Sequence, residues 1–166
     1  MLSPDRLSRR SALFGLAGLT ALSACGYRPL LAPTGPAAGL TGAVAITAPD
    51  SEAGYRLLTR LEDRLGRTTA PRLHLRVAMD FTESAAAVST DNRTSRYNLS
   101  GEANWELIDL ALERVIDSGT VNAFTGYGTG GNTVAIRAGK RDAEERLAHT
   151  LADRILTQVY ASKAAR

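Results

Sequence analysis

The stretch Arg72–Phe81, which reads RLHLRVAMDF, decides the fold because apolar and polar side chains alternate along it. Its apolar members stand at every second position from Leu73 to Phe81, and the positions between them are mostly polar. A period of two is the spacing of a β-strand, in which successive side chains point to opposite faces. The stretch therefore predicts a half-buried strand, with one face on a core and the other in water.

A second alternating run follows and predicts the partner of this strand. Apolar side chains from Tyr97 to Leu107 alternate with polar ones that begin at Arg96, and the polar residues 89–95 join the two runs. Two long alternating runs with a polar connection predict an antiparallel hairpin.

Two further strands are expected around this hairpin. A run over residues 115–127 follows a turn near Glu113, and the change of face over residues 107–112 predicts a β-bulge there. Residues 44–46 form a short strand candidate that Pro49 ends.

Two segments have the spacing of amphipathic helices. Residues 51–65 carry leucines at helical intervals, with Asp50 or Ser51 as the N-cap and Gly66 as the stop signal. Residues 142–160 predict a second helix with a stripe of apolar residues four apart, widened by two alanines. That stripe consists of Leu147, Leu151, Ile155 and Val159.

One apolar face on each strand and one apolar stripe on each helix require two layers that cover each other. We therefore predict an α+β fold, a two-layer sandwich with two helices packed on a mostly antiparallel four-stranded sheet. The element order is strand, helix, three strands, helix. This single domain spans residues 43–162, and residues 163–166 form a C-terminal tail.

The N-terminal segment has the pattern of an export signal. Three arginines lie within the first ten residues, and the apolar run over residues 12–22 follows them. This run is too short to cross a bilayer, which takes about 20 apolar residues as a helix. The segment Leu22–Cys25, LSAC, resembles the bacterial lipobox, in which the cysteine is lipidated and becomes the first mature residue.

We therefore interpret residues 1–24 as a lipoprotein signal peptide and Cys25 as the lipidation site. Residues 25–42, rich in Ala, Pro and Gly, predict a lipidated flexible tether. The adjacent Arg9 and Arg10 leave twin-arginine export open as an alternative to the general route.

Composition narrows the function classes. Without residues 1–24, the chain has 17 basic and 16 acidic groups, a net charge of +1. We do not expect nucleic acid as a partner, because such proteins keep a concentrated basic surface. Cys25 is the only cysteine, so no disulfide forms within the chain and a packed core must stabilise it.

Groups that could support catalysis are sparse. His74 is on the polar face of a predicted strand and His149 on a predicted helix, without the spacing of metal ligands. Glu144 and Glu145 are expected in the first turn of the second helix, where they complement its dipole. These patterns favour a protein that is not an enzyme and has no metal site or cofactor.

Glycines 126, 128 and 131 satisfy the G-x-G-x-x-G spacing of dinucleotide-binding loops. Such a site needs a helix that begins directly at the glycines, so that its N-terminus meets the pyrophosphate. The second helix is expected to begin about ten residues after Gly131, so the segment predicts a strand-to-helix loop instead.

A family resemblance rests on five segments. They are Cys25–Leu30 (CGYRPL), Tyr55–Leu58 (YRLL), the strand end near Asp109, the pair Ser118-Gly119, and Arg141–Arg146 (RDAEER). Together they resemble the LptE family of lipopolysaccharide-assembly lipoproteins, in its alphaproteobacterial form. The first segment is the most specific of the five.

This resemblance implies a fold and a function. It implies two helices on a four-stranded sheet, and a non-catalytic lipoprotein at the periplasmic face of the outer membrane. Gly26 fits that location, because inner-membrane lipoproteins typically have aspartate after the cysteine. The family's partners are the outer-membrane β-barrel LptD, which these proteins plug and help to assemble, and lipopolysaccharide, which they bind.

The phosphates of lipid A call for exposed arginine or lysine. The candidates lie in two groups that we expect toward one end of the domain: Arg93 and Arg96, and then Arg137, Lys140 and Arg141 before the second helix. Ordinary solubilising charge is an alternative for all five. An alternative function with the same composition is a lipoprotein scaffold or pilot for a secretin or an ABC transporter.

Overall fold

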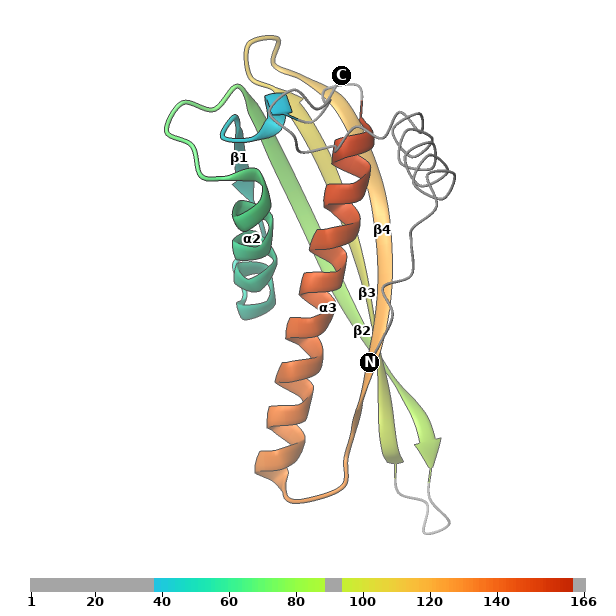
Figure 1. Cartoon of the computed structure of the whole chain (residues 1–166). Coiled ribbons are helices and arrows are strands. Elements are labelled where there is room, and N and C mark those ends of the chain that lie inside the picture. Colours follow the sequence, from blue (N-terminus) through green and yellow to red (C-terminus); the bar gives the residue numbers. More distant parts are fainter. Residues whose placement is uncertain (1–37, 89–93, 163–166) are drawn as a thin grey trace, which may run out of the picture.

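The computed structural model describes residues 38–88 and 94–162. The order of elements confirms the predicted one, with a short 3-10 helix in front (Figure 1). The elements are η1 (Ala38–Leu40), β1 (Val44–Thr47), α2 (Glu52–Leu65), β2 (Leu73–Val88), β3 (Thr94–Asp109), β4 (Arg114–Gly128) and α3 (Thr133–Ala161).

The four strands form one open sheet in the order β1-β2-β3-β4. β1 runs parallel to β2, and the other two pairs are antiparallel, which confirms a mostly antiparallel sheet. The β2–β3 hairpin is longer than predicted, because it pairs from Leu73 opposite Asp109 to Val88 opposite Thr94. A register shift between Leu107 and Ile108 confirms the predicted bulge.

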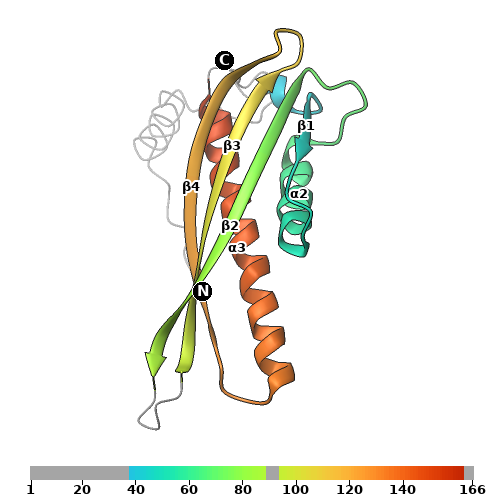
Figure 2. The same cartoon turned by 180° about the vertical axis from the view of Figure 1, so that it is seen from behind.

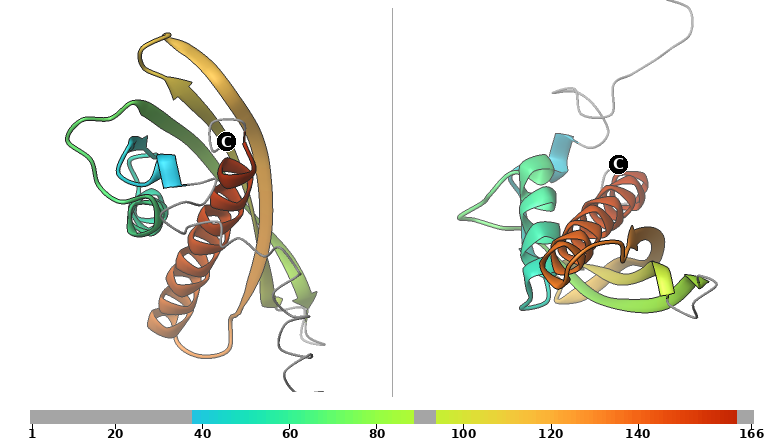
Figure 3. Two further views of the ribbon diagram at one scale, coloured as in Figure 1. Left: turned by 45° about the horizontal axis from the view of Figure 1, so that its top comes forward. Right: turned by 90° about the horizontal axis from the view of Figure 1, so that it is seen from below.

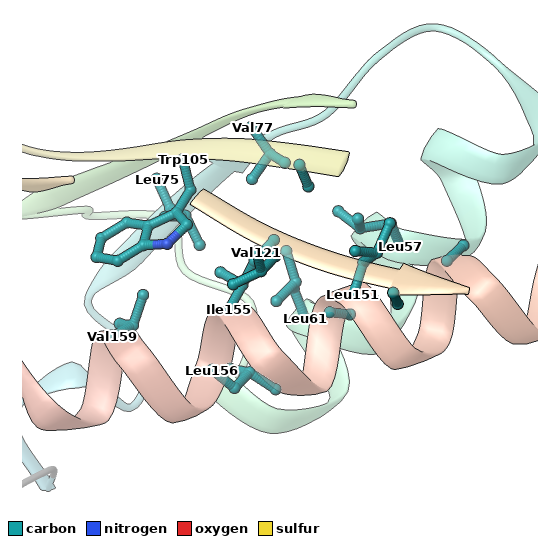
Figure 4. Close-up of a cluster of buried hydrophobic side chains, with 14 of the residues drawn as sticks. Leu57, Leu61, Leu75, Val77, Trp105, Val121, Leu151, Ile155, Leu156 and Val159 are labelled. Carbon is teal, nitrogen blue, oxygen red and sulfur yellow. The ribbon is translucent and has the colours of Figure 1, made fainter. Parts of the chain in front are cut away.

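Both helices cover the same face of the sheet (Figure 3), so the predicted α+β architecture is confirmed. The core lies between the layers and receives side chains from every strand of the sheet and from both long helices. Figure 4 shows the centre of this core, with Leu57 and Leu61 of α2, Leu75 and Val77 of β2, Trp105 of β3, Val121 of β4, and Leu151, Ile155 and Val159 of α3.

The opposite face of the sheet has no helix over it (Figure 2). We call it the open face and define it by its exposed polar residues on β2, β3 and β4. They are Asp80, Thr82, Asn98, Ser100, Glu102, Asn104, Thr120 and Asn122. The alternation quoted from the sequence therefore separates a buried face from a polar face, as predicted.

Helix α2 begins and ends where the sequence predicts. The Ser51 hydroxyl accepts a hydrogen bond from the Gly54 N–H at 3.0 Å, which caps the first turn. Gly66 stands just after the last turn with φ at 78°, a conformation that favours glycine, and its N–H donates to the Glu62 carbonyl at 2.7 Å.

Helix α3 corrects the prediction, because it begins at Thr133 rather than near residue 142. Asn132 caps it, with its side-chain oxygen accepting the Ala135 N–H at 2.9 Å. The early turns lack an apolar stripe, since Ala143 is the first buried residue. Helical periodicity could therefore not locate the start, which is set by a capping side chain.

The beginning of the packed domain also differs from the prediction. Leu40, within the segment interpreted as a tether, is fully buried, and the Gly42 N–H donates to the Leu65 carbonyl at 2.6 Å. Residues 38–42 are therefore part of the domain. The signal peptide, Cys25 and the rest of the tether lie outside the described residues.

Candidate functional site

The molecule has two ends (Figures 1 and 2). At one, which we call the hairpin end, lie the tips of β2 and β3 and the start of α3; at the other, the turn end, lie η1 and the β3–β4 turn. Helix α3 runs between them with 29 residues. At about 1.5 Å per residue its length is about 43 Å. The described candidate residues for lipopolysaccharide contact are all toward the hairpin end, as predicted.

Lys140 belongs to a network that ties α3 to the hairpin. Its ammonium lies 2.7 Å from a carboxylate oxygen of Glu83. The hydrogen bond from Lys140, with a second from Tyr127, lowers the pKa of Glu83, and the same contact raises the pKa of Lys140. Burial raises the pKa of Tyr127, whose ring stacks on Tyr97 with centroids 5.6 Å apart. Lys140 therefore stays charged, and Glu83 offsets part of its charge.

The two glutamates assigned to the first turn of the second helix lie further along it, because α3 begins at Thr133. Glu145 faces α2 and lies 3.6 Å from Arg56. Arg141 lies at the same distance from Glu52 of α2. These pairs are exposed, so each contributes little to stability, but the second one partly neutralises Arg141.

Arg137 and the two cations that follow it lie inside α3, not before it, which corrects the sequence prediction. Residues three and four apart share one side of a helix, so Arg137, Lys140 and Arg141 form one basic stripe. Arg137 is exposed and makes no ion pair with any described residue. Arg137 is therefore the residue of this stripe that is best placed to pair with an anionic ligand.

Arg96 lies near the start of β3, opposite Gly128 of β4. Arg96 is exposed and shares the open face with the other polar residues of β3, whereas the neighbouring Tyr97 lies on the helix side and stacks on Tyr127. It makes no ion pair within residues 38–88 and 94–162. The structure therefore brings Arg96 to the same end as the basic stripe but on the other side of the sheet. Arg93 lies outside the described residues.

The open face has a shallow groove of about 580 Å³ near its centre. Asp80 and Glu102 stand directly opposite each other in it, and Phe124 beside them is 80% exposed. Like charges on facing strand positions repel each other. Arg154 of α3 also lines the groove and donates to the Asn122 carbonyl, so the groove combines two acidic groups, one basic group and an exposed ring.

The geometry of the glycine loop corrects the argument made from sequence. The helix does follow Gly131 directly, since Asn132 is its N-cap. Gly126 and Gly128, however, lie within β4, where they pair with Asn98 and Arg96. No strand follows α3 in the described chain to complete the strand-helix-strand unit that binds a dinucleotide.

Side chains that could carry other chemistry are dispersed. His74 shares a hydrogen bond of 2.8 Å with the Thr47 hydroxyl across β1 and β2. Among the described residues, no three His, Cys, Asp or Glu side chains gather as a metal site would require. No helix in the same residues is long and apolar enough to cross a membrane.

These features define a class: a small α+β domain with a helical layer on one face of its sheet and a largely polar open face on the other. The chain matches the model of the LptE family, described as lipopolysaccharide-assembly, over residues 41–159. This chain belongs to the LptE family. No curated protein sequence matches it.

Solved structures share the fold. A protein from Caulobacter crescentus CB15 described as a lipoprotein has a TM-score of 0.63 at 23% identity, over 76% of this chain and 93% of its own. The rare lipoprotein B of Shewanella oneidensis has a TM-score of 0.56 at 12% identity, over 72% and 92%. Lipoprotein B of Nitrosomonas europaea has a TM-score of 0.53 at 16% identity, over 73% and 83%.

Proposed function

We propose that this chain is an outer-membrane lipoprotein that plugs the β-barrel LptD, helps to assemble it, and binds lipopolysaccharide. Membership of the LptE family over residues 41–159 carries the proposal. The open face supports it, because most of its exposed side chains, Phe124 apart, are polar and the interior of a transmembrane barrel is polar as well. The domain acts by binding and not by catalysis.

The anchor is an acylated Cys25, which becomes the first residue once residues 1–24 are removed. More than one acyl chain is needed for stable attachment, at about 0.8 kcal/mol per buried methylene. Intact-mass measurement of the protein from membranes tests this directly. We expect an N-terminal Cys25 with the added mass of its acyl chains; an unmodified chain, or one that begins elsewhere, contradicts it.

The anchor sets the orientation of the domain. The tether joins the domain through η1 at the turn end, so this end faces the inner leaflet that holds the acyl chains. The hairpin end then lies about 43 Å away along α3, compared with a hydrocarbon core about 30 Å thick. The basic residues of the hairpin end therefore reach the level of the outer leaflet, where the lipopolysaccharide phosphates are.

Arg96 and Arg137 are the strongest contacts in this arrangement, since neither is paired with a described acid. A guanidinium binds phosphate through two parallel hydrogen bonds. Lys140 and Arg141 contribute less, because Glu83 and Glu52 already lie 2.7 Å and 3.6 Å from them. Arg93 completes the proposed set.

Charge reversal tests the set. Arg96→Glu and Arg137→Glu each weaken lipopolysaccharide binding by about tenfold or more, since hydrogen bonds to charged groups contribute about 1.5–3 kcal/mol. Arg114→Glu is the matched control, because Arg114 is an exposed arginine at the turn end. Equal binding by all three variants removes Arg96 and Arg137 from the site, and unchanged thermal unfolding shows that the fold is intact.

The barrel partner is tested on the open face. A photo-crosslinking residue at Asn104 or Asn122, both exposed there, is expected to attach to a large outer-membrane β-barrel in living cells. Attachment to components of a secretin or an ABC transporter instead favours the pilot function. No attachment from either position contradicts a barrel-facing open face.

A further inference from the structure

The β3–β4 turn carries a group of exposed apolar side chains that the proposed plug and its ligand contacts do not use. Leu110 is 42% exposed, Leu112 57% and Val115 50%. These three account for half of the six large apolar side chains that are exposed among the described residues. We call them the apolar tip. Single exposed apolar residues are ordinary, but three within six residues at one tip indicate a contact surface.

The turn holds the apolar tip in a fixed shape. The Asp109 carboxylate accepts the N–H groups of Ala111 and Leu112 at 2.9 Å and 3.0 Å. Glu113 has a φ of 50°, which closes the turn before β4 begins. A side chain presented by a closed turn loses little further freedom when it is buried.

Hydrogen bonds join this turn to the place where the tether reaches the domain. The Leu110 N–H donates to the Arg72 carbonyl at 3.1 Å, and the Arg72 guanidinium donates to the Gly39 carbonyl of η1 at 2.9 Å. Ala38 is only 13 positions after the proposed acylated cysteine. Thirteen steps along the chain span at most about 45 Å, and η1 enters the domain beside this turn (Figure 1), so the apolar tip lies at the end of the domain that is nearest to the anchor.

We propose that the apolar tip inserts into the interfacial region of the same leaflet that receives the acyl chains, as a second membrane contact. This inference rests on the proposed lipidation of Cys25. Apolar side chains that leave water gain free energy in proportion to the area buried, and a second signal converts marginal attachment into stable attachment. The contact also fixes the tilt of the domain, because it joins the membrane at a second point.

The charges around the apolar tip favour insertion into lipid by apolar contact over electrostatic attachment to lipid headgroups. Arg72 and Arg114 are balanced by Asp109 and Glu113, so the tip has no excess of positive charge. An electrostatic attachment would need several unpaired basic residues, each contributing to attraction by anionic lipids. The contact is therefore expected to be similar on neutral and anionic membranes.

The test uses the acylated mature protein reconstituted into vesicles, with a polarity-sensitive fluorophore on a new cysteine. Leu112→Cys places the label on the apolar tip. Val134→Cys is the matched control, because Val134 is 74% exposed and lies in the first turn of α3 at the hairpin end. Acylation blocks the native thiol, so only the new cysteine reacts. Vesicles of phosphatidylcholine alone and with added phosphatidylglycerol are compared.

We expect the label at residue 112 to shift to the blue and to be quenched several-fold more by a lipid-borne quencher than the label at 134, in both lipid mixtures. Equal quenching of the two labels on vesicles that carry the protein overturns the inference and leaves the lipidation intact. A label at 112 that is already shielded without vesicles indicates a protein contact and also overturns it. Protein that does not float with vesicles contradicts the lipidation itself, and the second contact with it.

Discussion

Gly101 stands where α3 packs closely on the sheet, so adding one methyl group there probes the packing of the two layers. A Cβ at this position would lie 2.9 Å from a ring carbon of Phe81 and 3.0 Å from methyl carbons of Leu147 and Leu151. All three contacts are tighter than side chains normally tolerate, and they come from both layers. Gly101→Ala therefore forces α3 away from β3 or moves Phe81 out of its position.

Overpacking of this kind costs about 1–3 kcal/mol. Alanine recovers up to about 1 kcal/mol of that, because glycine in a strand loses more conformational freedom on folding. We therefore expect Gly101→Ala to lower the free energy of unfolding by about 1–2 kcal/mol, and the melting temperature by about 4–8 °C.

Gly128→Ala is the matched control. Gly128 is also in a strand, and its Cβ would meet only the Ser95 carbonyl oxygen at 3.9 Å. This variant is expected to be as stable as the parent, or more stable by about 0.4–1 kcal/mol. Urea unfolding of both variants measures the difference. If Gly101→Ala is no less stable than Gly128→Ala, the close approach of α3 to β3 is wrong.

Three further predictions concern contacts made by α3. Leu151→Ala, at a fully buried position, should lower the free energy of unfolding by about 2–5 kcal/mol, whereas Leu112→Ala at an exposed one should change it by less than about 0.5 kcal/mol. The buried Trp105 N–H donates to the Gln158 side-chain oxygen at 2.7 Å, and Gln158→Leu removes this acceptor. The variant should lower the free energy of unfolding by about 1–3 kcal/mol and shift the fluorescence emission of the only tryptophan. An unchanged spectrum and an unchanged stability would argue against this hydrogen bond. Asp153 accepts two hydrogen bonds of 3.0 Å from Arg60, which lower the pKa of its carboxyl from the usual 3.8. The ionised carboxylate therefore stabilises the folded protein at pH values above 3.8. This stabilisation is lost as the pH falls through the lower pKa of the folded state. Asp153→Asn should therefore cost about 0.5–1 kcal/mol at neutral pH, and this difference should shrink below pH 3.8; a difference that grows in acid would contradict the assignment.

The alternating stretches predicted the sheet well, because a period of two leaves little doubt about which side chains face the core. The extension of β2 to Val88 escaped prediction, since small and polar residues replace the alternation after Phe81. Helix α3 was predicted only where its stripe is apolar. Its early turns form because Asn132 caps them, and capping by one side chain is a weaker signal in sequence than a repeated stripe.

The sequence predicted that the basic residues lie toward one end of the domain, but not which of them form contacts with acidic residues. The sequence analysis identified the basic residues and expected them at one end, where the described ones lie. It did not identify Glu83 and Tyr127, because their contact with Lys140 depends on how three separate elements pack. Nor did it separate the paired Lys140 from the unpaired Arg137, since both are simply basic residues in the sequence.

The most direct test of the central claim is the identity of the protein's partner. The full chain, carrying an affinity tag at its C-terminus, would be purified from detergent-solubilised outer membranes and its companions identified by mass spectrometry. We expect one dominant companion, the β-barrel LptD, in equal amount and with lipopolysaccharide bound. Recovery of the chain alone, or with a secretin or an ABC transporter in place of that barrel, would contradict the account.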